Sequence, residues 1–295
     1  MLIGAIEAGG TKFVCSVLDE FNETKDRCVI RTRGPEETLA EAADFFRKHP
    51  VDALGVGAFG PIDLNDRSET YGTIKNTPKT AWKDFPLLDE LKRKLGVPVA
   101  VDTDVNAACL GEFRFGAGRD TDSAMYITVG TGVGAGFVKD DQVFKGFTHP
   151  EMGHIKVSRM DGDSFEGVCP YHGDCLEGLV SGPAIEKRAG VKGADISADD
   201  PVWESVSHYI AQALVNYTLV LCPERIIIGG GVMKQSHLYP MIRKEFKRIL
   251  NDYITIGNLE SYITAPKLND DQGVIGAAAL AKDIVESQRK RPVSY

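Results

Sequence analysis

The chain has 295 residues, enough for two ordinary domains and too many for a small scaffold held together by disulfides. Hydrophobic residues make up 43% and charged residues 26%, a balance typical of folded soluble proteins and not of collagen-like, disordered or coiled-coil chains. Lys and Arg number 34 against 42 Asp and Glu, so the net charge is -8. Because nucleic-acid and membrane-surface binders usually carry a basic excess, we expect neither as a partner.

Targeting signals and a disulfide framework are not predicted. No run reaches the roughly 18 apolar residues of a membrane span, and the N-terminal segment MLIGAIEAGG lacks the basic region of a signal peptide. We therefore expect a cytoplasmic protein. Cys169 and Cys175 lie in a polar segment with a histidine between them, whereas the other four cysteines have apolar neighbours and are predicted to be core residues. Those four are Cys15, Cys28, Cys109 and Cys222.

Apolar runs and turn residues predict strands and helices that alternate along the chain. In the first part we expect strands at 2–7, 13–18, 28–32, 53–59 and 97–101, and helices at 36–48, 86–95 and 107–113. In the second part we expect a strand at 124–129, a second strand that follows the glycine turn and ends at 138, and a third strand at 225–229. We also expect helices at 203–221 and 272–288, and a loop over 158–177. This mixture predicts the α/β class with two lobes. We place the lobes at 1–115, joined by a C-terminal helix of about 272–295, and at 116–271.

Two glycine turns each join a pair of predicted strands, which suggests a duplicated α/β unit. Glycine allows a sharp turn and lets backbone N–H groups approach a phosphate. One such turn is equally well explained as a plain hairpin, but two after apolar strands favour phosphate binding. A third and weaker candidate follows the strand at 225–229, because glycine ends many buried strands. The candidate phosphate-binding residues are Gly9, Gly10, Thr11 and Lys12, then Thr131 and Gly132, then Gly230, Gly231 and Lys234.

An acidic segment follows the predicted strand at 97–101 and precedes a predicted helix. In open α/β sheets the carboxyl end of a strand faces the ligand. Asp102, Thr103 or Asp104 could simply cap the helix, which is the commoner role of such residues. Two acids and an Asn are more than a cap requires, and an ionised Asp can accept a hydroxyl proton. We expect Asp104 to be that base.

Four potential metal ligands lie close together in the sequence. Cys169, His172 and Cys175 form a C-x2-H-x2-C core, and His154 precedes it. Two nitrogen and two sulfur ligands suit tetrahedral zinc at about 2.0–2.3 Å, and such a closed site would be structural. The alternatives are a chance grouping of these side chains and a Cys169–Cys175 disulfide, which a cytoplasmic location disfavours. We prefer the zinc interpretation because of the spacing.

Two acidic residues flank this cluster. Glu151 lies three residues before His154, and Glu177 lies two residues after Cys175. Either could be an ordinary solvated acid or an acceptor for a sugar hydroxyl. Their position beside a predicted metal site favours the second interpretation.

These motifs together resemble the ROK family of sugar kinases over nearly the whole chain. Asp104 falls where the family keeps its catalytic Asp, and the loop ending at Glu177 is similar to the family's zinc loop. The combination looks most like the bacterial zinc-containing fructokinases. The segments that carry the resemblance are 7–12, 76–79 with Trp82, 102–106, 128–136, 151–154, 169–177, 181–183 and 229–234.

The resemblance implies an actin-like, ribonuclease-H-type fold, in which two duplicated α/β lobes surround a central cleft. It also implies ATP as phosphoryl donor, Mg²⁺ and Zn²⁺ as metals, and a homodimer. The implied sugar contacts are Asn76, Thr103, Glu151, His154 and Glu177. To the nucleotide contacts suggested by the glycine turns, the resemblance adds Pro183.

The sequence departs from the family pattern at three positions. Glu7 replaces an Asp, which puts the handling of Mg²⁺ in question. Thr103 replaces an Asn that often contacts the sugar. His172 replaces a cysteine of the zinc loop, so the number of ligands is preserved.

The expected reaction is phosphoryl transfer from ATP to the 6-hydroxyl of fructose, with Asp104 accepting the hydroxyl proton. Kinases for glucose, mannose or an N-acetylated hexosamine are alternatives, because hexoses differ only in the placement of hydroxyls. A sugar-responsive transcriptional regulator is a rival of another class. Such members of the family carry an N-terminal helix-turn-helix, which we do not expect here because the first phosphate motif begins at residue 7 and the net charge of -8 is unsuited to DNA. A catalytically inactive sugar-binding protein is the third alternative, which the presence of Asp104 disfavours.

Overall fold

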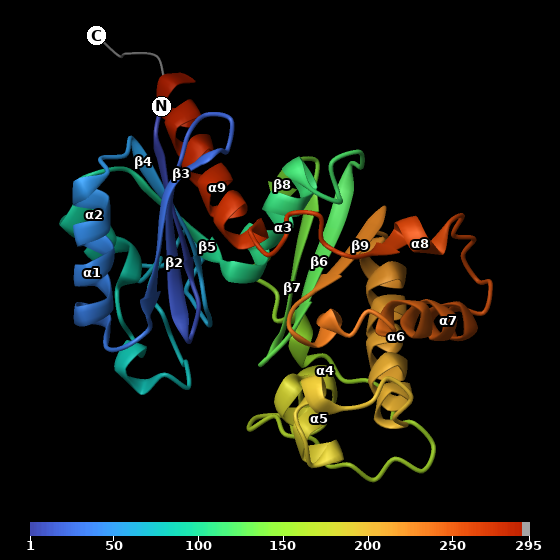
Figure 1. Ribbon diagram of the computed structural model, residues 1–295. Helices are drawn as coiled ribbons and strands as arrows, with labels where there is room; N and C mark the ends of the chain where they lie inside the picture. Colours follow the sequence, from blue (N-terminus) through green and yellow to red (C-terminus); the bar gives the residue numbers. More distant parts are fainter. Residues whose placement is uncertain (291–295) are drawn as a thin grey trace. The chain divides into compact units, whose positions relative to one another are not determined.

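A computed structural model describes residues 1–290 of the chain, and these residues form two compact units (Figure 1). Each unit has a five-stranded mixed sheet with helices packed on it, which confirms the predicted α/β class. Unit 1 is built from three separate segments of the chain and unit 2 from two. Unit 1 comprises Met1–Gly116, Val143–His149 and the residues from Leu268 onward, and unit 2 comprises Ala117–Gln142 and Pro150–Lys267.

The sheet of unit 1 has the strand order β3-β2-β1-β4-β5. β1 pairs with β2 in the antiparallel sense, whereas β1, β4 and β5 run parallel. The strands are β1 (Ile3–Ala8), β2 (Lys12–Leu18), β3 (Thr24–Arg31), β4 (Ala53–Ala58) and β5 (Val99–Thr103). The helices are α1 (Pro35–Lys48), η1 (Thr80–Trp82), α2 (Leu87–Leu95), α3 (Asp104–Phe115) and α9 (Gln272–Lys290).

Side chains of unit 1 alternate between two apolar layers, as expected for a sheet that is covered on both faces. Phe13 and Cys15 face the side of α1 and α2, where Leu39 of α1 is fully buried. α9 lies on the opposite face (Figure 1). It packs very closely on β4, because a Cβ at Gly55 would lie 1.7 Å from the carbonyl oxygen of Ala277.

The sheet of unit 2 repeats this plan. Its strand order is β10-β9-β6-β7-β8, with an antiparallel β6–β7 hairpin and parallel β6, β9 and β10. The strands are β6 (Ser123–Val129), β7 (Val133–Lys139), β8 (Gln142–Val143), β9 (Arg225–Gly229) and β10 (Ile263–Thr264). The helices are η2 (Met152–His154), α4 (Leu176–Val180), α5 (Gly182–Ala189), η3 (Gly193–Asp195), α6 (Val202–Leu221), η4 (Val232–Lys234), α7 (Leu238–Leu250) and α8 (Leu259–Tyr262).

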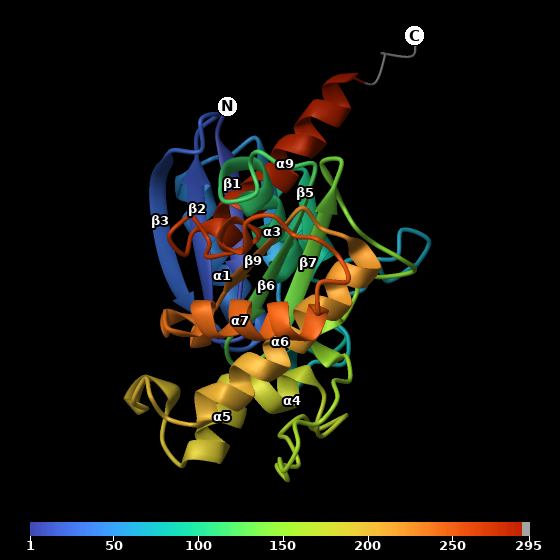
Figure 2. The same ribbon diagram turned by 90° about the vertical axis from the view of Figure 1, so that its right-hand side faces the viewer.

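The core of unit 2 forms between its sheet and the long helix α6, against which α7 packs (Figure 2). Trp203 and Tyr209 of α6 are fully buried and anchor this layer. Among the described residues, none of the helices combines the length and the apolar character that a membrane span requires.

Three predicted features differ from the structure. The helix expected at 107–113 begins at Asp104, because the side chain of Thr103 caps it. The last helix is described up to Lys290, and the part of its predicted range at 291–295 lies outside the described residues. Cys222 is exposed and not a core residue, because it lies just past the end of α6 in the left-handed conformation, with φ 47°.

Candidate functional site

The first glycine turn and Asp104 both follow strands that end at the same edge of the unit 1 sheet. The parallel register pairs Ala8 of β1 with Ala58 of β4, and Ala58 with Thr103 of β5. The turn beginning at Gly9 and the helix beginning at Asp104 therefore start at the same edge of the sheet, on either side of the strand β4. In open α/β sheets this edge is the one that binds ligands.

The first glycine turn is held by hydrogen bonds. The Gly9 N–H donates to the Lys12 carbonyl at 2.9 Å, and the Thr32 hydroxyl donates to the Gly9 carbonyl at 2.7 Å. Lys79 extends over the turn, because its Cε lies 3.0 Å from where a Cβ of Gly10 would be. The predicted site did not include Lys79, and it adds a positive charge to a turn whose N–H groups suit a phosphate.

The start of α3 fixes the position of Asp104. The Thr103 side chain accepts a hydrogen bond from the Asn106 N–H at 3.1 Å and so caps the helix. Asp104 is the first helical residue and is half-buried, and its Oδ1 accepts from the Val105 N–H at 2.9 Å. The cap uses the oxygen of Thr103, while its hydroxyl hydrogen can still be donated. A sugar contact by Thr103 thus stays a prediction.

Asp102 is the most buried acid at this edge, with 2% of its surface exposed. Its Oδ1 accepts from the Thr103 N–H at 2.8 Å and from Asn106 Nδ2 at 2.7 Å. Its Oδ2 lies 2.9 Å from Lys145 Nζ. Burial lowers the pKa of Lys145, but the charge of Asp102 and its hydrogen bond outweigh this effect, so that the pKa of Lys145 is raised.

The remaining predicted residues of unit 1 lie in different surroundings. Asn76 is exposed in the loop before η1. Glu7 extends toward the start of α9, where its Cδ lies 2.7 Å from the position of a Cβ on Gly273. Burial raises the pKa of Glu7, although Lys12 and Arg27 act in the opposite direction.

Three glycine-containing segments meet in unit 2. β6 and β9 are parallel and pair Thr128 with Gly229, so the turns that follow them start at the same edge. The Gly182 N–H at the start of α5 donates to the Gly130 carbonyl at 2.7 Å, and a Cβ on Gly130 would lie 3.7 Å from the backbone nitrogen of Gly231. The predicted residues Thr131, Pro183, Gly231 and Lys234 are exposed on these three segments.

We expect Gly230→Ala to destabilise the protein by about 1–3 kcal/mol. Gly230 has φ 93°, and a Cβ there would lie 2.4 Å from the Val129 carbonyl oxygen. Gly231→Ala is the matched control, since Gly231 has φ -61° and no atom within 4 Å of its Cβ position. Urea unfolding of the two variants tests this, and equal unfolding free energies would contradict the expected strain.

The four predicted metal ligands lie together in unit 2. One ligand atom from each of His154, Cys169, His172 and Cys175 lies within 4.8 Å of the others. His154 Nδ1 is 3.7 Å from the Cys169 sulfur and 3.5 Å from the Cys175 sulfur, and His172 Nδ1 is 3.8 Å from the Cys169 sulfur. A tetrahedral zinc ion with ordinary bond lengths requires nitrogen–sulfur separations of about 3.6 Å. The donor set and its spacing therefore fit zinc.

The Cys175 thiol must lose its proton when it binds a metal ion. Burial, followed by its interaction with Cys169, raises the pKa of Cys175 to about 11 in the metal-free chain. A bound cation would favour the thiolate instead. Residues outside the loop at 169–175 also hold it in place. Lys156 and Arg159 both pair with Asp174, and Lys156 Nζ donates to the His172 carbonyl at 2.7 Å.

Glu177 connects this cluster to the second glycine turn. Its Oε2 accepts from the Val133 N–H at 2.9 Å, and its Oε1 lies 4.0 Å from His154 Nε2. His154 Nδ1 faces the two cysteines, so the Glu177 carboxylate and the cysteine sulfurs lie near different nitrogens of the same imidazole ring. Glu151 is exposed directly before η2, which carries His154. The structure thus brings Glu177, His154 and the Gly132 turn together within unit 2.

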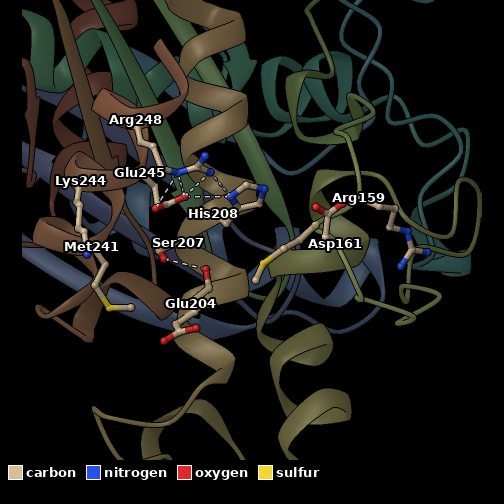
Figure 3. Close-up of a pocket in the computed structure, with 10 residues that line it drawn as sticks. Arg159, Asp161, Glu204, Ser207, His208, Met241, Lys244, Glu245 and Arg248 are labelled. Carbon is tan, nitrogen blue, oxygen red and sulfur yellow. Dashed lines mark hydrogen bonds and ion pairs between the residues drawn. The ribbon is translucent and has the colours of Figure 1, made fainter. Parts of the chain in front are cut away.

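A cavity of about 650 Å³ lies elsewhere in unit 2, between α6, α7 and the segment at 159–161 (Figure 3). His208 Nδ1 lies 3.0 Å from Glu245 Oε2, and Arg248 pairs with the same carboxylate. None of the residues predicted for the site lines this cavity. The glycine turns, Asp104 and the Cys/His cluster carry recognisable chemistry, so the candidate functional residues of each unit are these and not the residues that line this cavity.

Comparison with known proteins gives consistent results. Residues 3–284 match the model of the ROK family. The chain is 48% identical to a fructokinase of Pediococcus pentosaceus, covering 96% of this chain and 98% of the relative. It is 46% identical to a putative fructokinase of Bacillus subtilis, covering 97% of each. A ROK family glucokinase from Streptomyces griseus, solved in complex with glucose and AMPPNP, aligns with TM-score 0.77 and 28% identity over 96% of this chain and all of that one.

Proposed function

The chain belongs to the ROK family, and on that premise we propose that it is an ATP-dependent fructokinase that forms fructose 6-phosphate. The observation that carries the proposal is that the Gly9 turn and the helix that begins at Asp104 both start at the carboxyl edge of the unit 1 sheet. The choice of fructose is supported by the two fructokinase relatives, which are 48% and 46% identical.

In the proposed reaction, Asp104 accepts the proton of the sugar 6-hydroxyl as the oxygen attacks the terminal phosphorus of ATP. The bond from this phosphorus to the bridging oxygen of ATP breaks, and ADP leaves. Phosphoryl transfer depends mainly on positioning and on electrostatic stabilisation of the transferred group. Backbone N–H groups of the glycine turns and the ammonium of Lys79 are suited to that task.

We propose that the residues that contact the sugar are Asn76, Thr103, Glu151, His154 and Glu177. His154 would contribute to two sites, because its Nδ1 faces the cysteines while its Nε2 remains available as a hydrogen-bond donor. The zinc held by the Cys/His cluster would fix the orientation of this ring. Loss of the ion would then weaken sugar binding as well as stability.

We propose that the glycine segments are the phosphate-binding segments of the chain, and that Mg²⁺ enters bound to the phosphates of ATP. The assigned residues are Gly9, Gly10, Thr11, Lys12, Thr131, Gly132, Pro183, Gly230, Gly231 and Lys234.

A panel of sugars tests the assignment of the acceptor. We expect kcat/KM to be highest for fructose and at least tenfold lower for glucose, mannose and N-acetylated hexosamines. A site that hydrogen-bonds each hydroxyl of its substrate discriminates strongly against an analogue that leaves these groups unpaired. A higher kcat/KM for glucose would make the chain a glucokinase, the activity named for the Streptomyces griseus relative.

Assembly and location belong to the same proposal. We propose a cytoplasmic homodimer, as the family resemblance implies. Light scattering on the purified chain is expected to give twice the chain mass of 32.1 kDa. A mass equal to one chain over the concentration range of the activity assay would exclude the dimer.

A further inference from the structure

Lys145 supplies the cationic partner of a carboxylate that lies two residues before the proposed base. Asp102 has a partner on each oxygen, and Lys145 Nζ at 2.9 Å is the charged one. The lysine side chain is 30% exposed and the aspartate side chain only 2%. Lys145 belongs to the short segment Val143–His149, which joins unit 1 although the chain on both sides of it belongs to unit 2.

We propose that Lys145 is a positioning residue for phosphoryl transfer, which neutralises Asp102 and so keeps Asp104 able to accept a proton at mildly acidic pH. The inference rests on the proposed function, because Asp104 acts as a base only if the chain is a kinase. Lys145 itself need not contact sugar or nucleotide. It acts through Asp102 on the first turn of α3.

The electrostatic reason is that two carboxylates lie two residues apart in the sequence, at the start of one helix. Asp102 and Asp104 flank a single residue, and a like charge nearby disfavours the charged form of a carboxylate. Pairing with Lys145 cancels the charge of Asp102. Without the lysine, the buried Asp102 would be left uncompensated, which is costly inside a protein.

Asp102 is not the only group that acts on Lys145. The others that act on it are the hydroxyl of Tyr71 and the carboxylate of Asp66. Tyr71 is also influenced by Asp63, and burial raises its pKa, which keeps the phenol neutral. Asp102 and Asp66 act on both Lys145 and Tyr71, so the loss of Lys145 would remove a positive charge from a region that also holds acidic groups.

The ion pair also has a geometric consequence. Asp102 Oδ1 holds both the Thr103 N–H and the amide of Asn106, and the Asn106 N–H in turn bonds to the Thr103 side chain. These three bonds define the first turn of α3, in which Asp104 stands. Lys145 therefore fixes the carboxylate on which this turn is built.

The test is the pH dependence of kcat/KM for the sugar, measured at saturating ATP. In Lys145→Met we expect the midpoint of the acid limb to move up by about one pH unit. In Asp102→Asn we expect it to move down, because Lys145 is left without its anion. The double variant is expected to lie near the wild type, and Lys145→Arg to restore the wild-type midpoint. Lys139→Met, at an exposed lysine that ends β7, is the matched control.

Opposite shifts in the two single variants cannot arise from a merely structural role, since loss of folding would lower activity at every pH. Unmoved midpoints in an active enzyme, or shifts in the same direction, would overturn the inference while leaving the proposed function intact. If the wild type phosphorylates no hexose, the proposed function fails and the inference fails with it. If Lys145→Met does not fold, Asp102→Asn and the double variant carry the same comparison.

Discussion

Replacing Asp104 by Asn is expected to lower kcat by about 10²–10⁴-fold, the usual contribution of a general base. The amide has nearly the same shape and can still accept from the Val105 N–H, so the first turn of α3 should be retained. It cannot accept a proton from a sugar hydroxyl at any working pH. We therefore expect the dissociation constant for fructose, measured by calorimetry, to change by less than about threefold.

Asp89→Asn is the matched control for this experiment. Asp89 is an exposed acid in the first turn of α2, within the same unit. Its replacement should leave kcat within about twofold of the wild type. Normal turnover in Asp104→Asn would remove Asp104 from the mechanism, and weak sugar binding in that variant would mean that Asp104 acts mainly as a binding residue.

Replacing Cys175 by Ser is expected to abolish metal binding and to lower the melting temperature by about 5–10 °C. Loss of a thiolate opens the tetrahedral set, and metal affinity contributes directly to folding free energy. In a chain of this size a few kcal/mol correspond to such a shift. Elemental analysis should find about one zinc per chain in the wild type and almost none in the variant, and KM for fructose should rise because His154 loses its anchor.

Cys222→Ser is the control for this second variant, since Cys222 is exposed at the end of α6 and outside the cluster. It should keep both zinc and melting temperature. A wild type that is fully active and contains no metal would refute the zinc assignment. Retention of zinc in Cys175→Ser would show that the remaining three ligands suffice.

The architecture of the sheets could be predicted because its signals are local. Apolar runs and glycine turns mark β1–β2 and β6–β7, and the shared plan anticipates the repeated strand order. The spacing C-x2-H-x2-C likewise places three ligand atoms in one tight loop. In these cases neighbours in sequence are neighbours in space, so a pattern is sufficient.

Features that depend on long-range packing could not be predicted. Nothing in the sequence around Lys145 indicates that it pairs with Asp102, and nothing around Lys79 indicates that it covers Gly10. Both contacts arise because loops return to the sheet edge. The first residue of α3 could not be predicted for a different reason. Thr103 can cap this helix only when the strand before it ends at that residue, and the sequence does not fix where the strand ends.

The central claim is tested most directly by incubating the purified chain with fructose, ATP and Mg²⁺ and identifying the products by phosphorus NMR. The account predicts one ADP for each fructose 6-phosphate, with negligible ATP hydrolysis when sugar is omitted. A folded, zinc-loaded chain that yields no sugar phosphate from fructose or any other hexose would contradict it.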